Sequence, residues 1–392
     1  MEENPPSRIL ARQPRAAGVA SLETNLMEFT IHHQILLIVF GLGLVLGAIA
    51  NKTNFCTMGA VSDWVNMGDT GRLRAWLLAG AVGLLGVVIL EASGMATLGN
   101  TTFPPYRTPF FGWLRYLLGG LLFGIGMTLA SGCGNKTLVR IGGGNLKSLV
   151  VLVIAAACAY AMLWTDFYNA VFGQLIGATT VDLAASGFTS QTLGDLTGMG
   201  NTVAGAIVGL ALVGFAFASR DFRENRDNIL AGVVIGLLVI AGWYVTGGSM
   251  GAEWKEYADF ADTKPLRVET QSFTFISPMG DAARYAMNPG DTSLINFGIV
   301  AMIGVVVGSL LWALVSKGFR IEWFVDGKDF FNHAAGAVLM GIGGVLSMGC
   351  TVGQGITGVS TLALGSFLTL AAIIAGAAAT MKYQYWRMMQ EV

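Results

Sequence analysis

Long apolar stretches separated by short polar segments run along most of the chain. A hydrocarbon core of about 30 Å is crossed by about 20 apolar residues in a helix, and the stretches approach that length. The pattern predicts nine spans, at residues 34–50, 75–95, 113–129, 146–163, 202–217, 228–243, 295–315, 333–346 and 367–382. We therefore expect an all-α polytopic membrane protein.

The same pattern suggests how the chain is divided. Residues 1–29 hold no apolar stretch and are expected to be a mobile N-terminal tail without a cleavable signal peptide. Residues 30–385 are expected to form one transmembrane transport domain, with halves at 34–163 and 228–382 and a connector span at 202–217. The long, polar and net acidic segment 245–293 is predicted to be an external loop that either caps the entrance or alters selectivity.

Composition supports this class of protein and excludes others. Hydrophobic residues make up 54% of the 392 residues and charged residues only 12%, against about 25% in ordinary soluble domains. That excludes a disordered chain, and a net charge of −1 gives no reason to expect a nucleic-acid partner. The four cysteines form no CxxC pair, which argues against a disulfide scaffold and a closed zinc site. No cofactor and no metal ligand set are predicted.

Positive charge indicates the orientation, because Lys and Arg concentrate in cytoplasmic loops. They gather in the segments 136–147, 220–227, 317–329 and 382–387. With the predicted spans, this places the C-terminus in the cytoplasm and the N-terminus outside. The arginines of the N-terminal tail disagree with this orientation. At the cytoplasmic face, Asp63 is expected to pair with Arg72 or Arg74.

Two segments far apart in the sequence resemble each other. Residues 124–133 (GIGMTLASGC) and 341–350 (GIGGVLSMGC) are identical at six of ten positions. A fainter pair, 57–60 and 249–252, has the same offset of five spans. An odd offset turns the second copy upside down in the membrane, so the sequence predicts an inverted pseudo-twofold repeat, an architecture of transporters.

Glycine-rich runs follow both copies, at 132–145 and 349–365. They are too polar to face lipid, and irregular backbone at membrane depth is tolerated only against protein or a wet cavity. Short re-entrant half-helices are therefore expected to start just after Cys133 and Cys350. Their free N–H groups would point toward the membrane centre and favour an anion there.

Cys56, Cys133 and Cys350 lie at these breaks, whereas Cys158 lies in an apolar run and is interpreted as a packing residue. A neutral thiol is a weak, polarizable donor, which suits the weak serial binding that transport needs. The predicted substrate pathway adds polar neighbours to the three cysteines: Ser131, Asn135, Lys136, Thr351 and Gln354. An interfacial lysine and ordinary loop residues remain alternatives for several of these neighbours. No catalytic residue is assigned.

Two other functions would use the same cysteines. A membrane thiol–disulfide oxidoreductase would exchange disulfides through nearby cysteine pairs, although these three are distant in sequence. A soft-metal transporter would also favour cysteine ligands, but it should add His or Met clusters, which the sequence does not show.

Three cysteine segments carry a family resemblance. They read TNFCTMGAVSDW at 53–64, continued by GDTGRLRAWLL at 68–78, then SGCGN at 131–135 and MGCT at 348–351. In order and spacing they make residues 34–385 similar to the YeeE/YedE family of sulfur-compound transporters.

The resemblance implies uptake of thiosulfate, or a related inorganic sulfur anion, across the bacterial inner membrane. It implies nine spanning helices with short re-entrant helices, and a relay in which Cys56, Cys133 and Cys350 pass the ion by S–H···S hydrogen bonds. It also implies a small cytoplasmic sulfur carrier of the SirA/TusA type as partner. No such domain follows residue 386, so this carrier is expected to be a separate chain.

Overall fold

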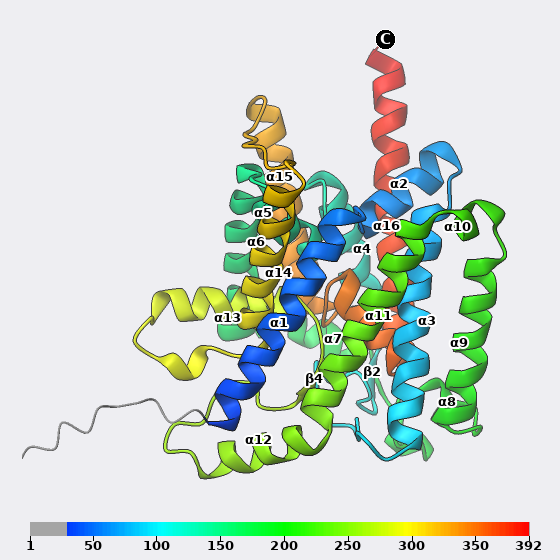
Figure 1. Cartoon of the computed structure of the whole chain (residues 1–392), viewed down its shortest axis with the longest axis vertical. Coiled ribbons are helices and arrows are strands. Elements are labelled where there is room, and N and C mark those ends of the chain that lie inside the picture. Colours follow the sequence, from blue (N-terminus) through cyan, green and yellow to red (C-terminus); the bar gives the residue numbers. More distant parts are fainter. Residues whose placement is uncertain (1–29, 392) are drawn as a thin grey trace, which may run out of the picture.

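Helices make up almost all of the computed structural model, which describes residues 30–391 (Figure 1). Within these residues, eight helices are long and apolar enough to cross a membrane, and α9 (Asn201–Phe217) is a shorter apolar helix. Each of the nine predicted spans falls on one of these helices, so an all-α, multi-pass architecture is confirmed. The expected tail at 1–29 lies outside the described residues.

The long helices begin or end a few residues from the predicted spans. They are α1 (Ile31–Lys52), α3 (Gly71–Ala92), α4 (Trp113–Leu129), α6 (Leu146–Trp164), α11 (Arg226–Gly247), α14 (Phe297–Val315), α15 (Gly327–Leu346) and α16 (Leu364–Glu391). The largest difference is at α16, whose polar last turns project beyond the rest of the molecule (Figure 1). Hydropathy could not place that end, because a helix continues through polar residues once it leaves an apolar environment.

Short elements connect the long helices. The short helices are α2 (Thr57–Met67), α5 (Gly134–Gly142), α7 (Gln174–Ala178), α8 (Leu193–Leu196), α10 (Arg220–Glu224), α12 (Ser249–Phe260) and α13 (Ile276–Met287). The π-helical turns are η1 (Asn169–Gly173) and η4 (Gly353–Gly358), and the 3-10 turns are η2 (Ala184–Ser186) and η3 (Thr292–Leu294). Strand β1 (Thr102–Phe103) pairs in parallel with β4 (Thr270–Gln271), and β2 (Phe110–Gly112) pairs antiparallel with β3 (Thr180–Asp182).

Glycines allow the helices to approach closely. A Cβ at Gly47 would lie 2.0 Å from the carbonyl oxygen of Val305, and one at Gly308 would lie 2.0 Å from that of Leu44, so α1 and α14 touch backbone to backbone. Helix α4 approaches α15 in the same way, because a Cβ at Gly126 would lie 2.7 Å from the carbonyl oxygen of Gly336. Apolar helices gain no hydrophobic energy by leaving lipid, so close packing of small residues holds such bundles together.

The packing partners of the helices form matched sets. Helix α1 packs on α14, and α11 packs on α3; α4 packs on α16, and α15 packs on α6. Helices α4 and α15 also contact each other, as do α1 and α11. The short elements follow the same scheme, since α5 lies against α14 and α6 while η4 lies against α3 and α16.

The segment 245–293, for which the sequence predicts a polar external loop, contains regular structure. It holds α12, β4 and α13, and all residues from 271 to 281 are buried. Asp281 is fully buried and accepts hydrogen bonds from Arg267, Trp164 and Asn296. Residues 271–281 are therefore part of the core, because Asp281, the one charged residue among them, is satisfied by internal hydrogen bonds.

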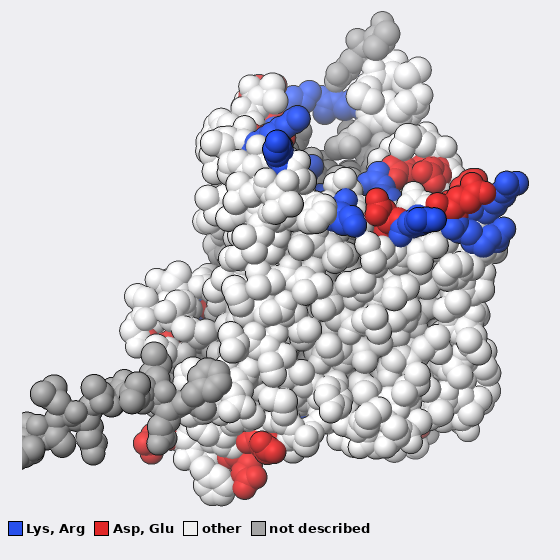
Figure 2. All heavy atoms as spheres, viewed as in Figure 1, with Lys and Arg blue, Asp and Glu red and all other residues white. Residues whose placement is uncertain are grey.

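On the face drawn in Figure 2, the charged side chains lie near the two ends of the bundle. In Figure 2 the middle of the molecule carries almost no Lys, Arg, Asp or Glu, as expected for a surface in contact with lipid. Lys and Arg gather at the end from which α16 projects, together with some acids, whereas the charged residues visible at the opposite end are acids.

Candidate functional site

Three of the four cysteines occupy the same local backbone arrangement. Cys56, Cys133 and Cys350 each directly precede a short helical segment. The sulfur of Cys56 accepts the backbone N–H of Gly59 at 3.4 Å, and that of Cys350 accepts the N–H of Gly353 at 3.4 Å. Cys133 stands at the N-cap position of α5, but its side chain makes no cap hydrogen bond. The Cys56 and Cys350 thiols therefore cap the helical segments that follow them, as N-cap side chains do, and Cys133 has the same place in the backbone without that bond.

A second shared feature lies two residues before each cysteine. Asn54, Ser131 and Met348 have positive φ values of 50°, 56° and 61°. This left-handed conformation is uncommon for residues with a side chain and marks a sharp reversal. The preceding long helix therefore ends, the chain turns, and the next short helix begins at the cysteine. The half-helices expected after Cys133 and Cys350 are present as α5 and as the segment containing η4.

The structure brings these three thiols together, although they are distant in the sequence. The Cys133 thiol lies near those of Cys56 and Cys350, and it faces the hydroxyl of Thr351. All three are buried, with Cys56 the most accessible at 7%. Cys158 lies elsewhere, in the middle of α6, so the sequence distinguished it correctly from the other three.

The predicted polar neighbours differ in how they are engaged. The Thr351 hydroxyl is fully buried and, apart from the Cys133 thiol, has no hydrogen-bond partner among the described residues. The side-chain oxygen of Asn135 is likewise buried and unpartnered in the described part of the chain. Gln354 is already committed, because its amide donates to the Ser347 carbonyl and its oxygen accepts from Ser366. Of the predicted neighbours, Thr351 and Asn135 are therefore buried polar groups with bonding capacity to spare; the Thr274 hydroxyl, which lies against Gly353 and which sequence reasoning missed, is another.

A cleft of about 670 Å³ leads to Cys56 from the end of the molecule that carries α16. It also contains Ser131 and Lys136, so three of the predicted pathway residues border it. The ammonium of Lys136 lies 3.4 Å from the side-chain oxygen of Asn54. Cys133 and Cys350 do not line this cleft and lie buried beyond it.

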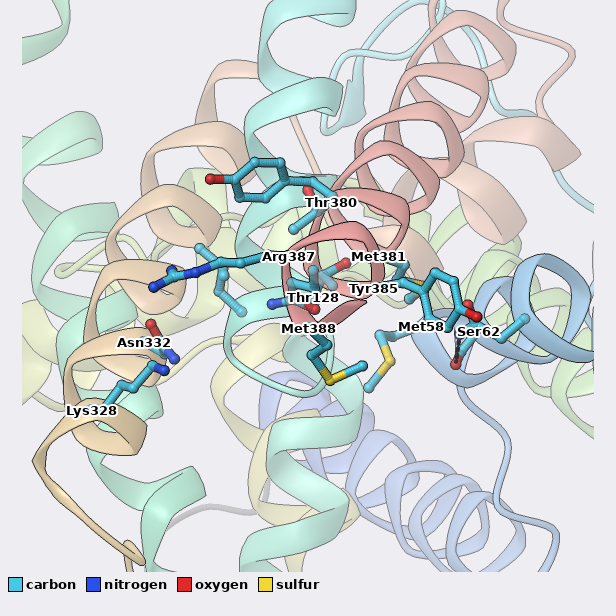
Figure 3. A pocket seen from close by; sticks show the side chains of 14 residues that line it. Met58, Ser62, Thr128, Lys328, Asn332, Thr380, Met381, Tyr385, Arg387 and Met388 are labelled. Atoms are coloured by element: carbon cyan, nitrogen blue, oxygen red, sulfur yellow. Dashed lines mark hydrogen bonds between the residues drawn. The ribbon is translucent and has the colours of Figure 1, made fainter. Parts of the chain in front are cut away.

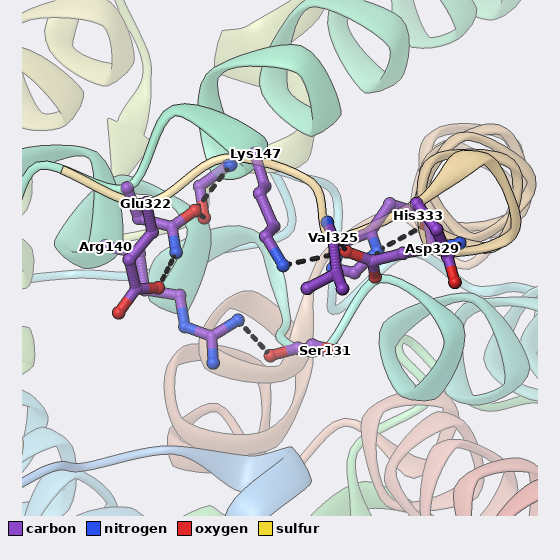
Figure 4. A network of polar contacts seen from close by, with 10 residues as sticks. Ser131, Arg140, Lys147, Glu322, Val325, Asp329 and His333 are labelled. Atoms are coloured by element: carbon purple, nitrogen blue, oxygen red, sulfur yellow. Dashed lines mark hydrogen bonds and ion pairs between the residues drawn. The ribbon is translucent and has the colours of Figure 1, made fainter.

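The walls of the cleft are fixed by polar contacts (Figure 4). Arg140 donates to the carbonyl oxygen of Ser131 at 2.8 Å. The chain near Arg320 runs beside the turn between α5 and α6, with backbone hydrogen bonds from Arg320 to Gly143 and from Leu146 to Glu322. These contacts hold a segment from late in the chain against one from its first half.

An ion pair supports the wall on the side of Cys56. Asp63 on α2 pairs with Arg72 on α3, which is the first of the two expected arrangements. The ion pair uses Nε and Nη2 of Arg72, and the remaining guanidinium nitrogen, Nη1, lies against α2. A Cβ at Gly59 would come within 2.4 Å of this nitrogen. The absence of a side chain at Gly59 thus leaves room for a positive group next to the Cys56 thiol.

Sequence reasoning missed the arginines of this cleft. Arg72, Arg140 and Arg320 line it together with Lys136. For Arg140 a signal existed, since it follows Lys136 by four residues on a helix and therefore shares its face. No local signal could identify Arg320, which comes from a connector in the other half of the sequence.

A second cleft of about 620 Å³ opens on the same end of the molecule, beside the last turns of α16 (Figure 3). Met58, Met388 and Tyr385 face it, with Lys328 and Arg387 at its rim. It contains none of the three clustered cysteines.

Comparison with known proteins gives a consistent result. The sequence model of a family described as "Sulphur transport" matches residues 52–379. A protein of Escherichia coli (strain K12) named "Thiosulfate transporter TsuA" is 23% identical over 365 residues, which cover 85% of this chain and 90% of that protein. A protein of the same name from Spirochaeta thermophila is 23% identical over 265 residues, which cover 66% of this chain and 74% of that protein.

Proposed function

Since the chain belongs to the sulphur transport family, we propose that it takes up thiosulfate, or a related inorganic sulfur anion, across the bacterial inner membrane. The ion follows a central path lined by Cys56, Cys133 and Cys350. The names of the two relatives support thiosulfate as the substrate.

One observation carries this proposal: three thiols from distant parts of the chain meet inside a bundle of membrane helices, and a charged cleft leads to the outermost of them. Each thiol stands at the N-terminus of a helical segment, where the dipole is positive. A sulfur anion can then exchange weak S–H contacts stepwise without becoming trapped by a formal charge at each position.

The polar neighbours have distinct roles in this mechanism. An anion with two negative charges loses water on entering the path, which costs several kcal/mol per charge. Lys136 and the helix N-termini offset that cost at the cleft. The unpartnered Asn135 and Thr351 side chains offer further polar contacts in the buried part, and Ser131 borders the way between cleft and thiols. Gln354 keeps the η4 segment, and with it the Cys350 end of the path, in place through its two hydrogen bonds.

We also propose that the two halves form an inverted repeat. The packing scheme supports this, because exchanging α1, α3, α4 and α6 with α11, α14, α15 and α16 reproduces the observed contacts. In this scheme α2, which packs on α16, corresponds to α13, which packs on α6. The fainter sequence pair 57–60 and 249–252 does not fit it, since α12 lies against α1 and α11 instead.

The C-terminus is proposed to lie in the cytoplasm. The gathering of Lys and Arg at the end that carries α16 supports this orientation. The cleft is then the cytoplasmic mouth of the path, and the connector 93–112 lies outside. A separate small carrier of the SirA/TusA type would receive sulfur at the cytoplasmic mouth.

Uptake of radiolabelled thiosulfate into proteoliposomes tests the function. Wild-type protein should accumulate the label, whereas Cys133→Ala and Cys350→Ala should abolish uptake at normal protein levels. Cys158→Ala serves as the matched control and should transport normally. Full activity of the first two variants would contradict the thiol relay.

Two assays on cells that express the protein separate the alternatives. A thiol–disulfide oxidoreductase would form a mixed disulfide with a partner on non-reducing gels, and a soft-metal carrier would make the cells accumulate the metal. Either result without thiosulfate uptake would replace the proposal.

A further inference from the structure

The cleft that leads to Cys56 holds more positive charge than a thiol relay requires. Its lining includes the cationic side chains Arg72, Lys136, Arg140 and Arg320. Glu322 is the single acid of the lining, and one of its carboxylate oxygens accepts a hydrogen bond from Asn145. Asp63 neutralises part of the charge of Arg72 from behind the wall. The balance of the cleft is therefore positive.

The donors in this cleft converge from separate elements. Arg72 comes from α3, Lys136 and Arg140 from α5, and Arg320 from the connector after α14. Nη1 of Arg72 takes no part in the pair with Asp63 and lies beside Cys56, and one guanidinium nitrogen of Arg140 already donates to the Ser131 carbonyl. Guanidinium groups present several N–H donors in a fixed fork that matches the oxygens of an oxoanion.

We propose that this cleft is a binding site of its own for a tetrahedral, doubly charged oxoanion, adjoining the thiol path at Cys56. This inference rests on the proposed function and adds a position at which the ion is held by oxygen contacts rather than by sulfur contacts. Recognition there depends on charge and shape, so the site accepts sulfate as well as thiosulfate. Sulfate at the mouth therefore competes with thiosulfate that leaves the path.

Sulfate is the appropriate probe because it has the charge and shape of the substrate without its terminal sulfur. Isothermal titration of sodium sulfate into the full-length, detergent-purified protein measures binding directly. We expect saturable binding that weakens as sodium chloride is added, since salt screens exposed charges. The variant Arg140→Gln/Arg320→Gln should bind about tenfold more weakly, because two of the charge contacts are lost.

Two matched variants separate charge from fold. Arg140→Lys/Arg320→Lys keeps the charge and should retain most of the affinity. Arg220→Gln/Arg223→Gln removes two exposed arginines elsewhere and should bind as wild type does. The single variant Arg320→Gln changes an exposed side chain and should still bind about threefold more weakly, which keeps the test informative if the double variant aggregates.

The outcomes also distinguish this site from the relay. Cys133→Ala should lose thiosulfate uptake and bind sulfate as wild type does. Absence of sulfate binding to the wild type, unchanged binding in both Arg→Gln variants of the cleft, or loss of binding in Cys133→Ala would each overturn the cleft site. Wild-type proteoliposomes that fail to take up thiosulfate, while sulfate still binds in the cleft, would overturn the proposed function alone.

Discussion

Asp281 lends itself to a quantitative prediction, because it joins three parts of the fold while fully buried. It accepts hydrogen bonds from Nε and Nη2 of Arg267 at 2.6 and 3.0 Å, from the indole of Trp164 at 3.1 Å and from Asn296 at 3.0 Å. These contacts fix α13, whose N-cap residue Phe275 lies with its backbone against the Cys350 thiol. Replacing Asp281 with Ala should therefore destabilise the fold and displace one wall of the thiol path.

The magnitude follows from the groups left behind. Leaving Arg267 without its buried partner lowers the free energy of unfolding by about 3–5 kcal/mol. The Trp164 and Asn296 donors, left unpaired, each lower it by about 1 kcal/mol more. Arg267 keeps its stacking over the ring of Phe103, with its guanidinium carbon 4.0 Å from the ring centroid, so that contact is the same in both proteins and cancels. The net loss is about 5–7 kcal/mol. For a chain of this size it corresponds to a fall of about 6–9 °C in apparent melting temperature.

Thermal unfolding of the detergent-purified protein, followed by tryptophan fluorescence, measures this effect. Asp259→Ala is the matched control, because Asp259 and Lys264 form an ion pair in which both side chains are about two-thirds exposed; it should shift the melting temperature by less than about 2 °C. The double variant Asp281→Ala/Arg267→Met should regain part of the loss, since no charge is left unpaired. If Asp281→Ala melted within the range of the control, the reasoning would be refuted.

Three further predictions test other parts of the structure. Gly47→Ala should lower the melting temperature and the yield of monodisperse protein, because its Cβ would meet the Val305 carbonyl, whereas Gly41→Ala on the same helix has open space and should be tolerated; size-exclusion profiles compare the two. Lys136→Met should reduce thiosulfate uptake at least tenfold by removing a cation beside the thiols. Lys52→Met, which removes a cation stacked on Trp312, should leave uptake near wild type. Initial rates of uptake into proteoliposomes compare the two variants. Although partial burial opposes it, hydrogen bonds from Ser190 and Thr189 lower the pKa of Asp195 below its usual 3.8. The stabilisation that these bonds give is present above that usual value and is lost as pH falls through the lowered pKa. Hydrogen exchange at residues 189–192 should therefore accelerate in acid in the wild type, and Asp195→Asn should abolish that pH dependence.

Much of the fold could be predicted because a membrane leaves a helix few alternatives. Every backbone group must be satisfied within the lipid, so a stretch such as 113–129 is necessarily helical, and here its bounds match those of α4. The cysteine breaks were equally visible, since glycine-rich polar runs beside Cys133 and Cys350 cannot continue a lipid-facing helix. By the same reasoning Cys158, inside an apolar run, was placed correctly on α6.

Other features depended on contacts between distant segments. The sequence described 245–293 as a polar loop, because nothing local shows that Arg267, Trp164 and Asn296 would satisfy Asp281 and permit its burial. In the same way, Arg72, Arg140 and Arg320 are ordinary interfacial arginines until α3, α5 and a late connector meet around one cleft.

Hydropathy and backbone chemistry alone thus determined the helices, their breaks and the thiols at those breaks, because these depend on each segment's own exchange of water for lipid. Tertiary structure decided which breaks converge, which polar groups are buried and where positive charge collects. Those outcomes arise from close approach between helices that lie far apart in the sequence, and no local pattern encodes the distance between them.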